Sequence, residues 1–143
     1  MMTDKETLIG LTKQMGLAQS GDEITRLWHR DAVWFDLQFY RKSGLENCRA
    51  EFNRQFAKIS NVRTEFPEID AVVDGNVGFV RSIQRFRCDD LNGTEVCDFL
   101  TRQTDCYVKE DGKWKLIHQH VSLPTDFSTG KAIFGTELER KTK

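Results

Sequence analysis

The sequence has little proline, no long apolar run and no excess of charge of one sign. Pro67 and Pro124 are the only prolines among 143 residues, and no Pro- or Gly-rich stretch separates two domains. No apolar run approaches the ~20 residues that span a bilayer, which argues against a membrane partner. The length is near that of one domain, so we predict a single domain over 1–143, with a core at 5–126 and a tail at 127–143.

The charge is balanced, since 21 basic and 22 acidic residues give a net charge of −1. A nucleic-acid-binding protein usually shows a basic patch or a high isoelectric point. The densest basic stretch here comprises Arg81, Arg85 and Arg87. Asp89 and Asp90 follow it at once, which indicates a solvated strand face and not a phosphate-binding track. The sequence therefore predicts no nucleic-acid partner.

The N-terminus is polar and acidic, and several motifs of cofactor chemistry are missing. Residues 1–6 (MMTDKE) lack the basic start and apolar stretch of a signal peptide, so we expect a cytoplasmic protein. No glycine-rich phosphate loop, nucleophile elbow or dinucleotide fingerprint occurs, and we predict no cofactor. The cysteines form no Cys-x-x-Cys pair, which argues against a structural zinc site.

Two of the cysteines flank a strong hairpin signal. A type I′ turn needs positive φ at both central positions, and Asn92-Gly93 suits it. Pairing outward from that turn sets Asp90 opposite Glu95 and Cys88 opposite Cys97. In this register the two thiols are within disulfide reach. In a reducing cytoplasm we expect two free thiols side by side.

The first sixty residues show helical spacing that one strand interrupts. Apolar residues recur at spacings of three and four over 4–19, and Asp22 is placed to cap a second, short helix. Residues 32–39 alternate instead, which predicts a strand whose odd-numbered face is strongly apolar. Ser43-Gly44 ends this strand and opens a third helix, in which apolar residues recur at helical spacing over 45–59.

From residue 61 onward the pattern predicts strands, near residues 62–73, 77–88, 95–109 and 113–123. Turn signals separate them at Asp74-Gly75-Asn76, Asn92-Gly93 and Asp111-Gly112. Three helices followed by antiparallel strands form an α+β order, not the alternation that builds a parallel sheet. The tail has few apolar residues and is expected to run over the surface or onto a partner.

Five segments resemble SnoaL-like and ketosteroid-isomerase-like proteins. Residues 28–36 (WHRDAVWFD) look like their short helix, acidic turn and first strand, and residues 40–44 (YRKSG) resemble the step into their third helix. Residues 75–80 (GNVGFV) are similar to one of their hairpins. Residues 102–104 (RQT) and 111–124 (DGKWKLIHQHVSLP) look like their final hairpin, which is shared with the association domain of calcium/calmodulin-dependent kinase.

This resemblance covers roughly residues 5–126 and implies a fold. The expected fold is the cone-shaped nuclear-transport-factor-2-like one, with three N-terminal helices packed on a curved, mainly antiparallel sheet around a mostly apolar pocket. It also implies homodimers that pack through the outer face of the sheet. It does not imply one activity, because the superfamily includes isomerases, polyketide cyclases, dehydratases, transport factors and assembly modules.

Asp36 is the first candidate for a catalytic residue. It falls on the polar side of the predicted strand, close to where ketosteroid isomerases keep their general-base aspartate, and Trp34 on the same side is a candidate substrate contact. A carboxylate near an apolar cavity has a raised pKa and can move a proton between carbon atoms. Alternatively, Asp36 hydrogen-bonds to the backbone or pairs with an arginine. No residue matches the isomerase tyrosine or its second, protonated aspartate, which stabilise a developing enolate.

His118 and His120 are the second candidates, because two residues apart on a strand they project from one face. A His-x-His pair supplies two metal ligands, but a catalytic zinc site needs a third, so we predict no metal site. One imidazole can instead serve as an acid, a base or a substrate hydrogen bond. The alternative is that one histidine lines the cavity and the other is structural.

Arg102, Thr104 and Ser122 are candidate substrate-binding residues on the same hairpin. Two registers are open for it. A three-residue turn sets Thr104 opposite His118 and Arg102 opposite His120. A two-residue turn sets Asp105 opposite His118 and Gln103 opposite His120 instead. We prefer the first, because it pairs apolar with apolar residues. A buried Arg102 then needs a counter-ion, either Asp36 or a ligand carboxylate.

The sequence therefore predicts a pocket protein for a small apolar or carboxylate-bearing molecule. As an enzyme it would be a cofactor-independent isomerase, cyclase or dehydratase that transfers a proton on an apolar carbonyl compound. Asp36 would be the base, one of the two histidines the acid or oxyanion donor, and Arg102 would hold the substrate. The alternative is a non-catalytic ligand-binding or dimerisation module whose polar residues satisfy one another.

Overall fold

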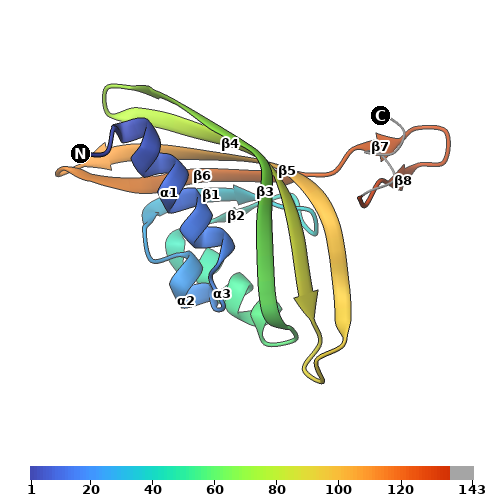
Figure 1. The fold of residues 1–143 in the computed structure, drawn as a ribbon. Coiled ribbons are helices and arrows are strands. Elements are labelled where there is room, and N and C mark those ends of the chain that lie inside the picture. The colour runs from blue at the N-terminus through green and yellow to red at the C-terminus, as the bar shows by residue number, and fades with distance from the viewer. Residues whose placement is uncertain (136–143) are drawn as a thin grey trace.

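A bent six-stranded sheet holds three helices in its hollow (Figure 1). In this computed structural model the structure describes residues 1–135. The strand order is β2-β1-β6-β5-β4-β3, in which β1 and β6 are parallel and the other neighbours are antiparallel. The predicted α+β fold is confirmed. Within residues 1–135, no helix combines the length and apolarity needed to cross a membrane.

Two helices occupy the N-terminus. They are α1 (Asp4–Gly16) and the single turn α2 (Gly21–Ile24). The cap of α2 is Ser20 and not the predicted Asp22, because Ser20 Oγ accepts a hydrogen bond of 3.1 Å from the backbone N–H of Glu23.

The first strand lies four residues earlier than predicted. β1 (Trp28–Phe35) is followed by the short β2 (Lys42–Ser43) and then by α3 (Leu45–Phe56). Gly44 joins β2 to α3 with a φ of 87°, a left-handed conformation that glycine adopts without a steric penalty.

The rest of the sheet is an antiparallel meander, as predicted. Its strands are β3 (Ser60–Asp74), β4 (Val77–Asp89), β5 (Glu95–Glu110) and β6 (Lys113–Ser122). The β3–β4 pairing carries two register shifts, and such irregularities bend long strands over the helices (Figure 1).

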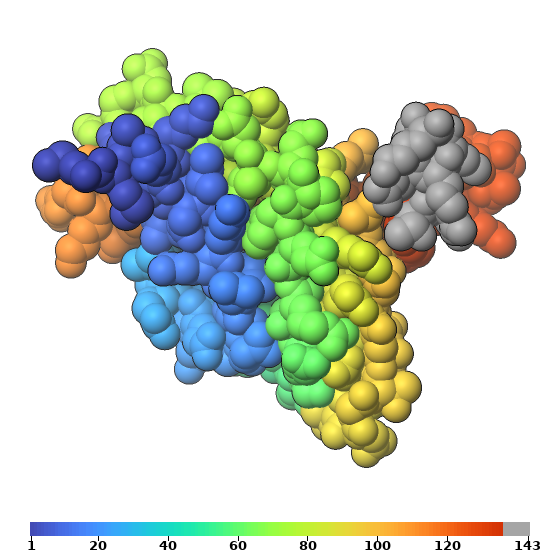
Figure 2. Space-filling view, in the orientation of Figure 1, coloured from blue at the N-terminus to red at the C-terminus, as the bar shows by residue number. Residues whose placement is uncertain are grey.

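The tail forms a small separate hairpin of β7 (Thr125–Asp126) and β8 (Lys131–Ala132). This hairpin stands apart from the body of the molecule (Figures 1 and 2). The chain then returns to the sheet, where Phe134 meets Phe99 edge-on with 5.7 Å between ring centroids. Residues 136–143 of the predicted tail lie outside the described residues.

The β5–β6 hairpin follows neither predicted register along its whole length. Near the turn the strands pair as in the two-residue alternative, with Glu110 opposite Lys113. An extra residue, Ile117, then forms a β-bulge, and His118 lies opposite Cys106. The preferred register is therefore wrong: the half of β6 near the turn is shifted by one residue relative to it, which turns its side chains to the other face. The half after the bulge is shifted by two residues, so that Thr104 lies opposite His120 instead of His118.

The β4–β5 hairpin confirms the predicted cysteine pair. Cys88 lies directly opposite Cys97, and both thiols are free. The predicted pairing closer to the turn is wrong, because a register shift next to Cys88 sets Asp89, and not Asp90, opposite Glu95.

The core lies between the helices and the concave face of the sheet. Trp34 of β1 stacks on Phe52 of α3 with 3.9 Å between ring centroids, and Trp28 meets both rings edge-on. On the sheet side, the buried Thr12 hydroxyl of α1 lies 2.8 Å from the Tyr107 hydroxyl. Aromatic burial supplies much of the apolar area of a small core. These contacts fix α3 and α1 over the sheet and leave a hollow between them.

Candidate functional site

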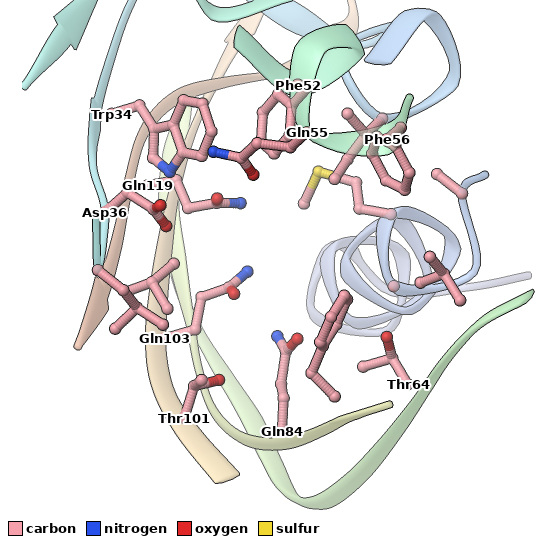
Figure 3. A pocket seen from close by; sticks show the side chains of 18 of the residues that line it. Trp34, Asp36, Phe52, Gln55, Phe56, Thr64, Gln84, Thr101, Gln103 and Gln119 are labelled. Atoms are coloured by element: carbon pink, nitrogen blue, oxygen red, sulfur yellow. The ribbon is translucent and has the colours of Figure 1, made fainter. Parts of the chain in front are cut away.

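A cavity of about 160 Å³ lies between the helices and the concave sheet face (Figure 3). Much of its wall is aromatic, from Trp34, Phe52, Phe56, Phe86 and Phe99. Its polar lining comprises Asp36, Gln38, Gln55, Thr64, Gln84, Thr101, Gln103 and Gln119. Within the described part of the chain, no Lys, Arg or His side chain lines it.

The cavity continues into a wider outer cleft of about 750 Å³. Asp36 and Gln55 line both spaces and so mark the passage between them. Arg54, Lys58 and His120 line the outer cleft only. A negatively charged ligand would therefore meet cationic side chains outside the inner cavity but not within it.

Asp36 follows the last residue of β1 and is half-buried beside the aromatic wall. Burial raises the pKa of its carboxyl group, and the negative charge of Glu51 adds to this rise. The backbone N–H groups of Leu37 and Gln38 favour the charged form and so lower the pKa in part. The balance leaves Asp36 a stronger base than an aspartate in water.

The indole of Trp34 presents its N–H group to Asp36 (Figure 3). This N–H group favours the charged form of Asp36 and so lowers its pKa. The two groups nevertheless do not meet the geometry of a hydrogen bond. Among the described residues, Trp34 Nε1 is one of two buried side-chain N or O atoms without a hydrogen-bond partner. An unpaired buried donor costs free energy, which a bound acceptor would recover. The site thus holds a base and an open donor side by side.

Asp105, which the sequence analysis did not select, lies fully buried beside two cavity-lining glutamines. Its carboxylate accepts hydrogen bonds of 2.9 Å from Gln103 Nε2 and 2.9 Å from Gln119 Nε2. Burial raises the pKa of Asp105 to about 6, and the two amide donors oppose this rise. Asp105 therefore fixes the orientation of two polar groups on the cavity wall.

Glu51 plays the same part on the helix side. It is 6% exposed and accepts hydrogen bonds of 2.6 Å from Arg54 and 3.1 Å from Gln55 Nε2. The Arg54 guanidinium holds the pKa of Glu51 below its usual range. Glu51 thereby orients the amide of Gln55, which also lines the cavity.

The predicted histidines do not line the inner cavity. His118 lies beyond the bulge, and its Nδ1–H donates a hydrogen bond of 2.7 Å to the backbone carbonyl of Val33. Phe35 contacts both rings, 4.8 Å from His118 and 5.5 Å from His120 between centroids. Val33 and Phe35 were predicted to face the core, but the buried residues of β1 are on the opposite face, with Trp34 only 1% exposed.

The predicted substrate-binding residues of the final hairpin also lie outside the inner cavity. Arg102 is exposed, and its Nε donates a hydrogen bond of 3.2 Å to Ser122 Oγ. Thr104 lies opposite His120 on the next strand. Over residues 1–135 no ion pair joins Arg102 to Asp36. The structure thus brings Trp34 and Asp36 together in the inner cavity, and none of the other candidates lines that cavity.

Ser122 and His120 do line the outer cleft, at its border with the tail. No three His, Cys, Asp or Glu side chains within residues 1–135 are grouped to hold a metal ion. Regular alternation along β6 does not predict Gln119 as a buried residue, because the buried positions change parity at the bulge. Trp114 and Leu116 are buried at even positions, whereas Gln119 and Val121 are buried at odd ones.

Comparison with solved structures shows the same fold. An NTF2-like protein of unknown function from Pseudomonas putida KT2440 is 21% identical, with 92% of this chain and 94% of that chain covered and a TM-score of 0.79. A proposed ketosteroid isomerase from Parabacteroides distasonis ATCC 8503 is 19% identical, with coverage of 84% and 87% and a TM-score of 0.69. A proposed dehydratase of the NTF2-like family from Streptomyces avermitilis is 14% identical, with coverage of 81% and 93% and a TM-score of 0.70.

Identities this low establish the fold and no more. No curated protein matches the chain. The family model described as SnoaL-like domain matches residues 11–126, which include every element from the second half of α1 to the end of β7. The chain has the fold of nuclear-transport-factor-2-like proteins, and it belongs to the SnoaL-like domain family.

Proposed function

We propose that this protein binds a small, largely apolar molecule in the inner cavity and that Asp36 transfers a proton on it. The observation that carries the proposal is the half-buried Asp36 carboxyl beside the unpaired Trp34 indole N–H, in the wall of an aromatic cavity. A base with a raised pKa removes a proton from carbon more readily than an ordinary aspartate. The reaction class is a cofactor-independent isomerisation or dehydration.

The cavity volume limits the size of the substrate. At about 160 Å³ the inner cavity is close to an engineered cavity of roughly 150 Å³ that binds benzene. A single six-membered ring fits such a space, whereas a fused polycyclic molecule would extend into the outer cleft. We therefore propose a single-ring carbonyl compound as the substrate.

The chemistry needs two groups at one place. The Asp36 carboxylate takes a proton from the carbon next to the carbonyl group, and the electron pair of the C–H bond moves to the carbonyl oxygen. Trp34 Nε1–H and the Thr101 hydroxyl, both in the cavity wall, are the donors that we assign to that oxygen. In an isomerisation Asp36 returns the proton to another carbon, and in a dehydration the electron pair expels a hydroxyl group that leaves with the proton as water.

A non-catalytic ligand-binding module is the second candidate. What favours it is that the polar groups of the final hairpin already have partners, as in the His118 bond to Val33 and the Arg102 bond to Ser122. These groups then hold the sheet together and take no part in a reaction. In that case Asp36 would contribute to ligand affinity without turnover.

Cyclohex-3-enone tests the proposal, because its conversion to cyclohex-2-enone needs proton removal and return on a single ring. We expect ultraviolet absorbance to show conversion above the buffer rate, and Asp36→Asn to reduce the protein-dependent rate by about 10²-fold or more. Asp31→Asn, at an exposed carboxylate on β1, is the matched control and should keep the full rate. Binding of the ketone without conversion would favour the non-catalytic module.

A further inference from the structure

Three glutamines on the cavity wall direct their amide nitrogens to carboxylates. Gln103 and Gln119 donate to Asp105, and Gln55 donates to Glu51. An ionised carboxylate accepts hydrogen bonds but cannot donate them. Each amide group is therefore held with its nitrogen toward the carboxylate, and its carbonyl oxygen is the end left for other partners.

Those carbonyl oxygens are open acceptors. Within residues 1–135, the buried side-chain N and O atoms that lack a partner are Trp34 Nε1 and Arg63 Nε, and no glutamine oxygen is among them. No hydrogen bond of the described residues reaches Oε1 of Gln103 or Gln119, so these atoms are accessible from the cavity that the two residues line. The cavity wall thus presents Oε1 of Gln103 and Gln119 as acceptors without a hydrogen-bond partner, and no hydrogen bond of the described residues reaches Gln55 Oε1 either.

The charged groups around the cavity are mainly negative, which also favours an uncharged ligand with donor groups. Asp36 lines it, Asp105 lies beneath two of its glutamines, and Glu51 bonds to a third. The neighbouring cations Arg54 and Lys58 line the outer cleft and not the inner cavity. An anion that entered would lose its hydration and meet negative charge, which is unfavourable on both counts.

We propose that the inner cavity selects uncharged single-ring molecules that present hydroxyl or amino donors to the Oε1 atoms of Gln55, Gln103 and Gln119, and that it rejects carboxylates of the same size. This inference rests on the proposed function, since it names the ligand class of that same cavity. It departs from the sequence-based expectation of a carboxylate-bearing ligand. A hydroxyl donor also favours dehydration over isomerisation, because the substrate then carries the group that leaves.

Four ring compounds separate the alternatives by calorimetric titration or by the NMR signal of the Trp34 indole N–H. They are resorcinol with two donors, phenol with one, anisole with an acceptor only, and benzoate with a negative charge. We expect affinity to fall in that order, with anisole at least about tenfold weaker than phenol because its oxygen faces unsatisfied acceptors. Equal affinity for phenol and anisole, or tightest binding of benzoate, would overturn the inference.

Gln55→Leu supplies the matched variant, because it removes one acceptor on α3 without disturbing the bonds to Asp105. We expect it to reduce the preference for phenol over anisole about threefold or more, while Gln14→Leu on the exposed side of α1 leaves it unchanged. An unchanged preference in Gln55→Leu, with the fold intact by circular dichroism, would contradict the role of Gln55.

The outcomes also separate this inference from the proposed function. If none of the four compounds binds the folded protein and cyclohex-3-enone is not converted, both proposals fail. If phenol and anisole bind equally while cyclohex-3-enone still reacts in a way that depends on Asp36, the donor selectivity alone fails.

Discussion

The two faces of the central sheet carry similar residue types in different surroundings. On the concave face, Asp105 and Gln119 are 0% and 3% exposed and are joined by a buried hydrogen bond of 2.9 Å. On the outer face, Arg85 and Asp98 form a two-bond pair at 2.8 Å and 2.8 Å while each stays about a third exposed. Burial raises the pKa of Asp105, whereas Arg85 lowers the pKa of Asp98, so the surroundings and not the residue type decide the direction of the shift.

Adjacent residues on β1 give the sharpest comparison of the two faces. Trp34 faces the core at 1% exposure, and Phe35 faces the outer side against the histidines. We expect Trp34→Ala to lower the free energy of unfolding by about 3–5 kcal/mol, because it opens a large void. Phe35→Ala should cost about 1 kcal/mol, since a half-buried ring loses less apolar contact. Urea denaturation measures both, and equal losses would contradict the assignment of faces.

Asp105 should make the protein less stable as pH rises, which is the reverse of most carboxylates. Its pKa rises from 3.8 to about 6 on folding, so the folded state holds the proton more tightly. The contribution to stability is therefore fully present below about pH 4 and is lost as pH rises through about 6. The loss is about 3 kcal/mol in this window, at 1.36 kcal/mol for each pH unit.

Asp105→Asn isolates that effect, because the amide does not titrate. We expect the free energy of unfolding of the wild type, measured against this variant by urea titration, to fall between pH 4 and pH 7. A difference that stays constant with pH would contradict the raised pKa. Asp98→Asn is the outer-face control and should show the opposite sign, because Arg85 holds the pKa of Asp98 below its usual range.

Local patterns predicted the order of the elements, because helical spacing, alternation and turn residues act over a few positions. They also predicted that Trp34 and Asp36 share one side of β1 and that Cys88 pairs with Cys97, which follows from a tight turn. The predictions that were wrong concern which residues of neighbouring strands lie opposite each other. The bulge at Ile117 reverses the end of β6, and the local pattern alone did not reveal it.

The same limit explains why Asp105 and its glutamines were not predicted as a group. Gln103 and Asp105 alternate on one strand, and Gln119 lies opposite Asp105 only in the register that follows the bulge. On β1 the apolar residues Val33 and Phe35 suggested the wrong core face, because the outer side of this strand is itself partly covered by the His118 ring. The grouping of Asp105 with its glutamines and the core face of β1 both depend on contacts between residues far apart in the sequence.

The smallest expected effect belongs to the outer face. Arg85→Gln removes the pair with Asp98, which joins β4 to β5 across the sheet. Both side chains are about a third exposed, at 33% and 36%, so water screens the attraction. We expect a loss of about 0.3–1 kcal/mol in the free energy of unfolding, which shrinks further in 1 M salt. A loss as large as that of Trp34→Ala, or one that salt leaves unchanged, would mean that the outer face is covered in solution, as the dimer expected from the family resemblance requires.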